Sequence, residues 1–78
     1  MTDRFSFPSF DNGRFQLYLL TDNSNPVKTR YALYSKDWEL GRVDVYLSGE
    51  IVVQPNDVGE IYLKNIQIDS ELAILIEQ

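Results

Sequence analysis

The stretch Arg42–Gln54, with the sequence RVDVYLSGEIVVQ, constrains the fold more than any other part of the chain. Two β-type runs, Arg42–Leu47 and Glu50–Gln54, flank Ser48 and Gly49, and this arrangement predicts a β-hairpin. A three-residue loop that ends at Gly49 is favoured, because glycine adopts the left-handed conformation that the last loop position requires. We therefore expect this hairpin at the centre of the molecule.

The spacing of apolar residues selects the register of this hairpin. A three-residue loop pairs Val45 with Ile51 and Val43 with Val53, which makes one face wholly apolar, whereas a two-residue loop leaves both faces mixed. A slip by one residue moves every side chain to the other face, so burial of one face favours the three-residue loop. The opposite, solvent-facing side then presents Asp44, Tyr46, Glu50 and Val52.

The chain has 78 residues and contains neither cysteine nor histidine, which limits its chemistry. A chain of this length forms one domain, residues 1–78, and its 44% of hydrophobic residues supports a globular core. Disulfides and thiolate metal sites are excluded, and the usual general base and the commonest metal ligand are missing. Paired carboxylates remain, but a domain of this size has little room for a catalytic cleft. We therefore predict no enzymatic activity, no metal and no cofactor.

The formal net charge of −5 is unevenly distributed along the chain. Residues 1–43 carry five acidic and six basic side chains, whereas residues 44–78 carry seven acidic side chains and one basic. An acidic surface disfavours direct binding of a nucleic acid backbone, which requires Lys and Arg. It suits a protein partner with a basic surface, although ordinary solubilising charge explains the same composition.

Alternation of apolar and polar residues predicts four further strands around the hairpin. These strands are Arg4–Phe10, Arg14–Thr21, Val27–Lys36 and Glu60–Ile68. Between the first two, Asn12-Gly13 predicts a tight type I′ turn with Asp11 opposite Arg14. The segment Asp22–Pro26 is a loop by composition and matches a calcium-binding loop poorly.

The C-terminal stretch Glu71–Gln78 fits two kinds of element. Leu72, Ile74 and Ile76 would line one face of a strand, whereas Leu72, Leu75 and Ile76 would form one stripe of a helix. The β-branched isoleucines and the short length favour the strand. The predicted fold is therefore all-β, a small antiparallel β-sandwich or open barrel of six to seven short strands, with a short C-terminal helix as the alternative.

Trp38 is the only tryptophan and lies in a predicted corner at Lys36–Gly41, between Asp37 and Glu39. A small domain needs its large apolar groups inside, which favours a buried position at the end of the core. Tryptophan is also enriched at binding hot spots, which would make an exposed Trp38 an anchor for a partner. Together with the outer face of the hairpin, the candidate binding residues are Trp38, Asp44, Tyr46 and Glu50.

These observations favour a non-enzymatic protein-interaction module that docks an acidic face onto a basic protein. An accessory inhibitor of a nucleic-acid-binding enzyme, of the kind that phages and mobile elements encode, fits the size and charge. A small carbohydrate- or ligand-binding β module with Trp38 as a stacking platform is the alternative. A nucleic-acid-binding barrel is a third hypothesis, which the net charge disfavours; its contact residues would be Lys28, Arg30, Tyr34 and Lys36.

The sequence also predicts location and self-association. The longest apolar run, Leu72–Ile76, is too short to span a bilayer, and residues 1–20 lack a signal-peptide pattern, so we expect a cytoplasmic protein with no membrane contact. Unpaired edge strands invite pairing, and a homodimer through such edges is a further expectation.

Overall fold

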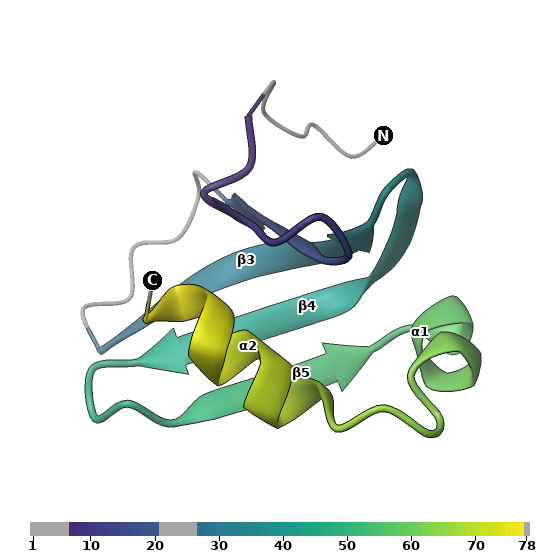
Figure 1. The fold of residues 1–78 in the computed structure, drawn as a ribbon. Helices are drawn as coiled ribbons and strands as arrows, with labels where there is room; N and C mark the ends of the chain where they lie inside the picture. Colours follow the sequence, from purple (N-terminus) through teal and green to yellow (C-terminus); the bar gives the residue numbers. More distant parts are fainter. Residues whose placement is uncertain (1–6, 21–26, 78) are drawn as a thin grey trace.

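The computed structural model describes residues 7–20 and 27–77, which form one antiparallel sheet and two helices (Figure 1). The order of strands in the sheet follows the chain, β1-β2-β3-β4-β5. The strands are β1 (Phe10–Asp11), β2 (Gln16–Leu19), β3 (Lys28–Ser35), β4 (Trp38–Tyr46) and β5 (Ile51–Pro55). The helices are α1 (Asp57–Tyr62) and α2 (Ile68–Ile76). Figure 1 shows α2 lying across one face of the sheet and α1 beyond the end of β5.

The prediction of a mostly antiparallel β protein is confirmed, but the sandwich or barrel of six to seven strands is not found. The described residues form one open sheet of five strands. The strand predicted at Glu60–Ile68 is wrong, because this segment holds the second half of α1 and the first residue of α2. The strand favoured for the C-terminal stretch is also wrong, and its helical alternative is correct. Because α2 covers one face of the sheet, that face needs no second sheet to bury it.

The hairpin formed by β4 and β5 has the predicted register, but the expectation that it lies at the centre of the molecule is wrong, because β5 is the last strand of the sheet. Val45 pairs with Ile51 and Val43 with Val53. The loop closes as expected, since Gly49 has a positive φ of 97° and its N–H donates to the carbonyl of Tyr46 at 2.9 Å. The apolar side of the hairpin belongs to the core, as the sequence pattern required.

The first turn is wider than the predicted type I′ turn. Asp11 pairs with Gln16 rather than with Arg14. The carboxylate of Asp11 accepts the N–H of Gly13 at 2.8 Å, and the side chain of Asn12 accepts the N–H of Arg14 at 3.0 Å. These side-chain acceptors act beside one backbone bond across the loop, from the N–H of Asn12 to the carbonyl of Phe15 at 3.2 Å.

The predicted strands Arg14–Thr21 and Val27–Lys36 are observed as the shorter strands β2 and β3. Of the first predicted strand, Arg4–Phe10, only Phe10 belongs to a strand, β1, and the prediction is wrong for residues 7–9. Its beginning at Arg4–Ser6 and the loop predicted at Asp22–Pro26 lie outside the described residues.

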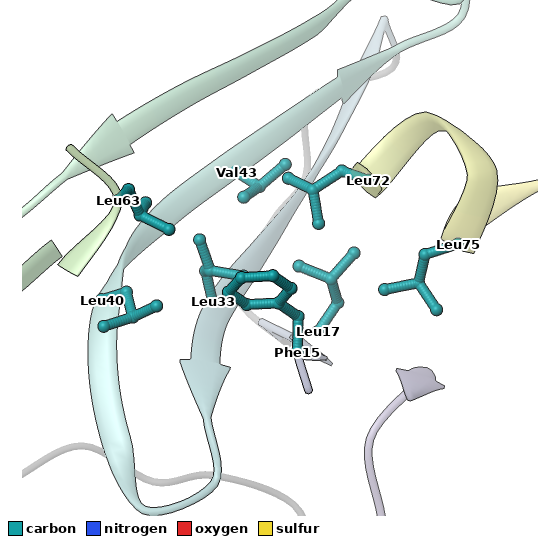
Figure 2. Close-up of a cluster of buried hydrophobic side chains, with 8 residues drawn as sticks. All are labelled: Phe15, Leu17, Leu33, Leu40, Val43, Leu63, Leu72 and Leu75. Atoms are coloured by element: carbon teal, nitrogen blue, oxygen red, sulfur yellow. The ribbon is translucent and has the colours of Figure 1, made fainter. Parts of the chain in front are cut away.

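The core lies between the sheet and the helical segments, and Figure 2 shows the two leucines of α2 pointing toward side chains of the strands. Each member of this cluster is no more than 8% exposed. The cluster consists of Phe15, Leu17, Leu33, Leu40, Val43, Leu63, Leu72 and Leu75. Because α2 contributes Leu72 and Leu75, its packing onto the sheet supplies much of the apolar burial on which a small domain depends.

Candidate functional site

Helix α1 is fixed to the beginning of β4 by Asn56. The side-chain oxygen of Asn56 caps the helix by accepting the N–H of Gly59 at 2.7 Å. Its side-chain nitrogen donates to the carbonyl of Glu39 at 3.0 Å, and its backbone N–H donates to the carbonyl of Leu40 at 2.8 Å. One residue therefore starts the helix and joins it to the strand.

Gly59 allows α1 to approach β4 at backbone distance. A Cβ atom at this position would lie 2.0 Å from the carbonyl oxygen of Leu40 and 3.0 Å from Cβ of Pro55. A real Cβ does not come so close to a backbone oxygen, so any other residue would push the helix away from the strand. The close approach places the outer face of α1 beside the first residue of β4, Trp38.

Trp38 lies in a shallow apolar pocket at this junction, with a volume of about 270 Å³. The other lining residues are Val58, Ile61 and Tyr62, all from α1. Trp38 is 64% exposed and Ile61 is 80% exposed. The prediction that Trp38 is buried is therefore wrong, and its alternative as an exposed aromatic group is correct. The predicted corner is also shorter, because β4 begins at Trp38 itself.

Tyr62 forms the fixed wall of this pocket. Its hydroxyl and the hydroxyl of Ser35 are 2.9 Å apart, and the Ser35 hydroxyl also donates to the carbonyl of Arg14 at 2.8 Å. The Tyr62 ring packs edge-on against Phe15, with a distance of 6.4 Å between the ring centroids. These contacts hold one aromatic side chain of the pocket in place before any partner binds, which lowers the entropy cost of binding.

Exposed carboxylates lie close to the pocket residues in the sequence. Asp37 precedes Trp38, and Asp57 and Glu60 lie on α1; all three are exposed. Glu39, on the other side of Trp38, forms an ion pair with Arg42. Carboxylates carried by the same elements as the apolar lining would suit a basic protein surface that carries an apolar side chain.

Asp44 is not part of an exposed acidic face, contrary to the sequence prediction. It is only 1% exposed, and its carboxylate lies 2.8 Å from Nε of Arg30 and 3.1 Å from Nζ of Lys28. The hydrogen bond from Arg30 is the main reason that the pKa of Asp44 lies below its ordinary value, and Lys28 acts in the same direction. Cross-strand neighbours on β3 neutralise this carboxylate, and hairpin alternation alone did not show them.

Tyr46 and Glu50 lie at the opposite end of β4 from Trp38. Tyr46 is partly buried, with Nζ of Lys28 5.6 Å from its ring centroid, and Glu50 is exposed. Eight residues of extended strand separate Trp38 from Tyr46, a span of about 26 Å at 3.3 Å per residue. The structure therefore divides the predicted set and leaves Trp38 with new neighbours from α1.

The residues of the third hypothesis, a nucleic-acid contact, do not form an exposed basic stripe. Lys28 and Arg30 are engaged with Asp44, and Tyr34 is only 7% exposed. Lys36 is exposed in the turn before β4. A stacking surface requires an accessible ring beside accessible cations, and this part of β3 does not provide one.

The sequence did contain a signal for the residues that were missed. Val58, Ile61 and Tyr62 follow the i, i+3, i+4 spacing of one helical face, directly after the capping residue Asn56. The interpretation of Glu60–Ile68 as a strand gave these residues no common face. With α1 in place, the same three side chains gather around Trp38.

No protein-family model, no curated protein and no solved structure matches the chain significantly. Within residues 7–20 and 27–77, no group of three carboxylates is arranged to hold a metal ion. Neither helix in this part of the chain is long and apolar enough to cross a membrane.

Proposed function

We propose that this chain is a non-enzymatic protein-interaction module that binds a basic protein partner through the Trp38 pocket. One observation carries the proposal. Among the described residues nine large hydrophobic side chains are exposed, and four of them line this single pocket: Trp38, Val58, Ile61 and Tyr62. Exposed apolar groups that gather in one place, with a polar surround, are typical of interaction sites.

The chemistry of the pocket fits this role. Trp38 offers a large apolar surface with few rotatable bonds, and tryptophan is among the residues that contribute most at binding hot spots. Asp57 and Glu60 on α1 would attract a basic surface and speed its approach. We therefore propose that the acidic residues that attract the partner lie on α1 rather than on the hairpin. A small inhibitor of a nucleic-acid-binding enzyme is one protein that would act in this way.

A carbohydrate-binding role is the second candidate, because an exposed indole ring can stack on a sugar. The pocket supports it less well. Sugar hydroxyls require several polar partners, and the lining supplies only the indole N–H and the Tyr62 hydroxyl, which already contacts Ser35.

The experiment is affinity capture from cells of the source with a tagged protein, followed by binding measurements with the purified partner. Trp38→Ala should weaken binding at least about tenfold, the effect of a moderate hot spot. Ile74→Ala is the matched control, because Ile74 is also 64% exposed but lies on α2 outside the pocket. Equal affinity for Trp38→Ala and Ile74→Ala would overturn the proposal.

The charge part of the proposal is tested with the same partner. The double variant Asp57→Asn/Glu60→Gln should lower the association rate, and raising the salt concentration should lower the rate of the unmodified protein. An association rate that depends on neither change would remove the basic partner from the proposal. Binding of a sugar that shifts Trp38 fluorescence, without any protein partner, would favour the second candidate instead.

A further inference from the structure

Strand β5 is an edge of the sheet, and half of its backbone groups point away from the sheet. The N–H of Tyr46 donates to the carbonyl of Glu50 at 2.9 Å, which fixes the alternation of the antiparallel ladder. Val52 and Gln54 therefore direct their backbone groups toward β4, and Ile51 and Val53 direct theirs outward. No described residue pairs with this outer side. Such an edge is a template for an additional strand.

A cleft of about 480 Å³ lies beside this edge, where β5 meets the two helices. Its apolar lining comes from Val53 and Pro55 of β5, from Leu63, and from Ile68 of α2. Two exposed carboxylates, Glu60 of α1 and Asp69 of α2, complete the lining. A lysine or arginine side chain matches this combination, because its stem is apolar and its end is cationic.

We propose that β5 receives an extended segment of the basic partner as a sixth strand, with a Lys or Arg side chain of that segment in the cleft. This inference deepens the proposed function, since it takes the same basic partner and gives the form in which it binds. Main-chain hydrogen bonds to Ile51 and Val53 would supply affinity. The cleft between Glu60 and Asp69 would supply the preference for a cation.

A second copy of the chain fits the edge less well than a basic segment does. The β5 strand of another copy would bring Glu50 and no Lys or Arg to the cleft. Each copy also carries a net charge of −5, so two copies repel each other at low salt. We therefore do not propose the homodimer expected from unpaired edges, and the experiment below checks for it.

The test uses a fluorescently labelled nine-residue peptide in which valine alternates with threonine around one central arginine. Binding to the full chain is followed by anisotropy, and amide exchange is followed by NMR. Binding should slow exchange of the amides of Ile51 and Val53. Replacing the central arginine by glutamate should weaken binding at least about tenfold, as expected for loss of a charge-assisted contact. Glu60→Lys/Asp69→Lys should have a similar effect, with Asp37→Lys/Glu77→Lys, at two exposed sites outside the cleft, as the charge-matched control.

Strand addition is separated from simple charge attraction by N-methylation of the peptide. Peptides methylated at alternate amides of one parity should lose binding, and those of the other parity should keep it, because an added strand uses every second amide. Equal binding of both parities, equal binding of the arginine and glutamate peptides, or no detectable binding at millimolar peptide would overturn the inference. So would a concentration-dependent dimer in sedimentation that Val53→Pro abolishes, since β5 would then be occupied by a second copy.

The inference and the proposed function fail in different ways. The Trp38 pocket uses Val58, Ile61 and Tyr62 of α1, whereas the cleft uses Gly59 and Glu60. Trp38→Ala should therefore bind the peptide with unchanged affinity. If the peptide does not bind the unmodified chain but partner capture still depends on Trp38, only the strand addition is overturned. Peptide binding with capture that is insensitive to Trp38→Ala overturns only the pocket.

Discussion

Asp44 shows how one buried charge is accommodated in a small domain. Among the described residues it is the only charged side chain that is fully buried, and it alternates with the core residues Val43 and Val45 along β4. It therefore lies on the sheet face opposite α2. Two cations from β3, Arg30 and Lys28, contact its two carboxylate oxygens. Removing the charge of this carboxylate would take a partner from both cations, and removing the cations would leave a buried charge unpaired; either change destabilises the fold.

The stability of the protein should depend on pH through Asp44. Its folded-state pKa lies below the ordinary value of 3.8, so its contribution is complete above that value and is lost as pH falls through the folded-state pKa. Urea unfolding between pH 7 and pH 2 should show this decline. Asp44→Asn should lower the free energy of unfolding by about 1–3 kcal/mol at pH 7. The decline of stability at low pH should also be smaller in this variant. Asp11→Asn is the comparison, because Asp11 also has a lowered pKa but is exposed. If Asp44→Asn lost as much stability at low pH as the unmodified protein, the decline could not be attributed to Asp44.

Gly59 should tolerate no side chain, although it lies within a helix. Alanine normally stabilises an exposed helix position relative to glycine by about 1 kcal/mol. At Gly59 the added Cβ would meet the carbonyl of Leu40 at 2.0 Å, so Gly59→Ala should instead destabilise the protein by about 1–3 kcal/mol. Thermal or urea unfolding measures the sign, with Lys64→Ala, an exposed site after α1, as the control. A stabilised Gly59→Ala would show that α1 does not approach β4 so closely.

At the scale of elements, the register of the β4–β5 hairpin was predicted correctly from sequence, whereas both helices were interpreted in favour of strands. The hairpin has a local two-residue period and a glycine where its loop requires one, so Val43–Val53 pairing follows from neighbouring residues alone. The helices are short, and α2 has isoleucines that prefer strands and no side-chain cap at Gln67. Burial of Leu72 and Leu75 against the sheet decides the outcome there, and that contact is tertiary.

The sequence identified only part of the candidate site. Trp38 was identified by residue type, since it is the only tryptophan, but its exposure follows from where β4 begins. Its pocket depends on α1, whose spacing was interpreted as part of a strand. The choice of Asp44 failed because cross-strand pairing with Arg30 cannot be obtained from the hairpin alone.

The helical nature of α2 predicts which leucines and isoleucines matter. In a strand, Leu72 and Ile74 would share one face, but in α2 Leu72 is fully buried and Ile74 is 64% exposed. Leu72→Ala should therefore cost about 2–5 kcal/mol, whereas Ile74→Ala should change stability by less than about 0.5 kcal/mol. Urea unfolding of the two variants gives the comparison. Similar losses for both would indicate that this segment is a strand.

For the whole molecule, the fold places both proposed binding surfaces next to α1. The acidic half of the chain includes both helices, so its charge lies beside two apolar surfaces: the Trp38 pocket on one side of α1 and the cleft at β5 on the other. Neither surface is visible in the sequence as a continuous stretch, because residues from β4, β5, α1 and α2 contribute to them. A partner that contacts both would enclose α1, which Asn56 joins to β4 by hydrogen bonds and Gly59 allows to approach β4 at backbone distance.

The single tryptophan reports directly on this distribution of charge. Trp38 is 64% exposed, so its emission should resemble that of a tryptophan in water and should be quenched readily by neutral acrylamide. The exposed carboxylates of Asp37, Asp57 and Glu60 should concentrate cations near the ring and repel anions. Caesium should therefore quench Trp38 more efficiently, relative to acrylamide, than iodide does.

The difference between caesium and iodide should shrink in 1 M salt, where the screening length falls to about 3 Å. The double variant Asp57→Asn/Glu60→Gln should reduce the difference at low salt, with Glu50→Gln/Glu77→Gln, at two exposed sites away from Trp38, as the charge-matched control. Preferential quenching by iodide would place positive charge beside Trp38, and an acidic surround could then no longer explain attraction of a basic partner.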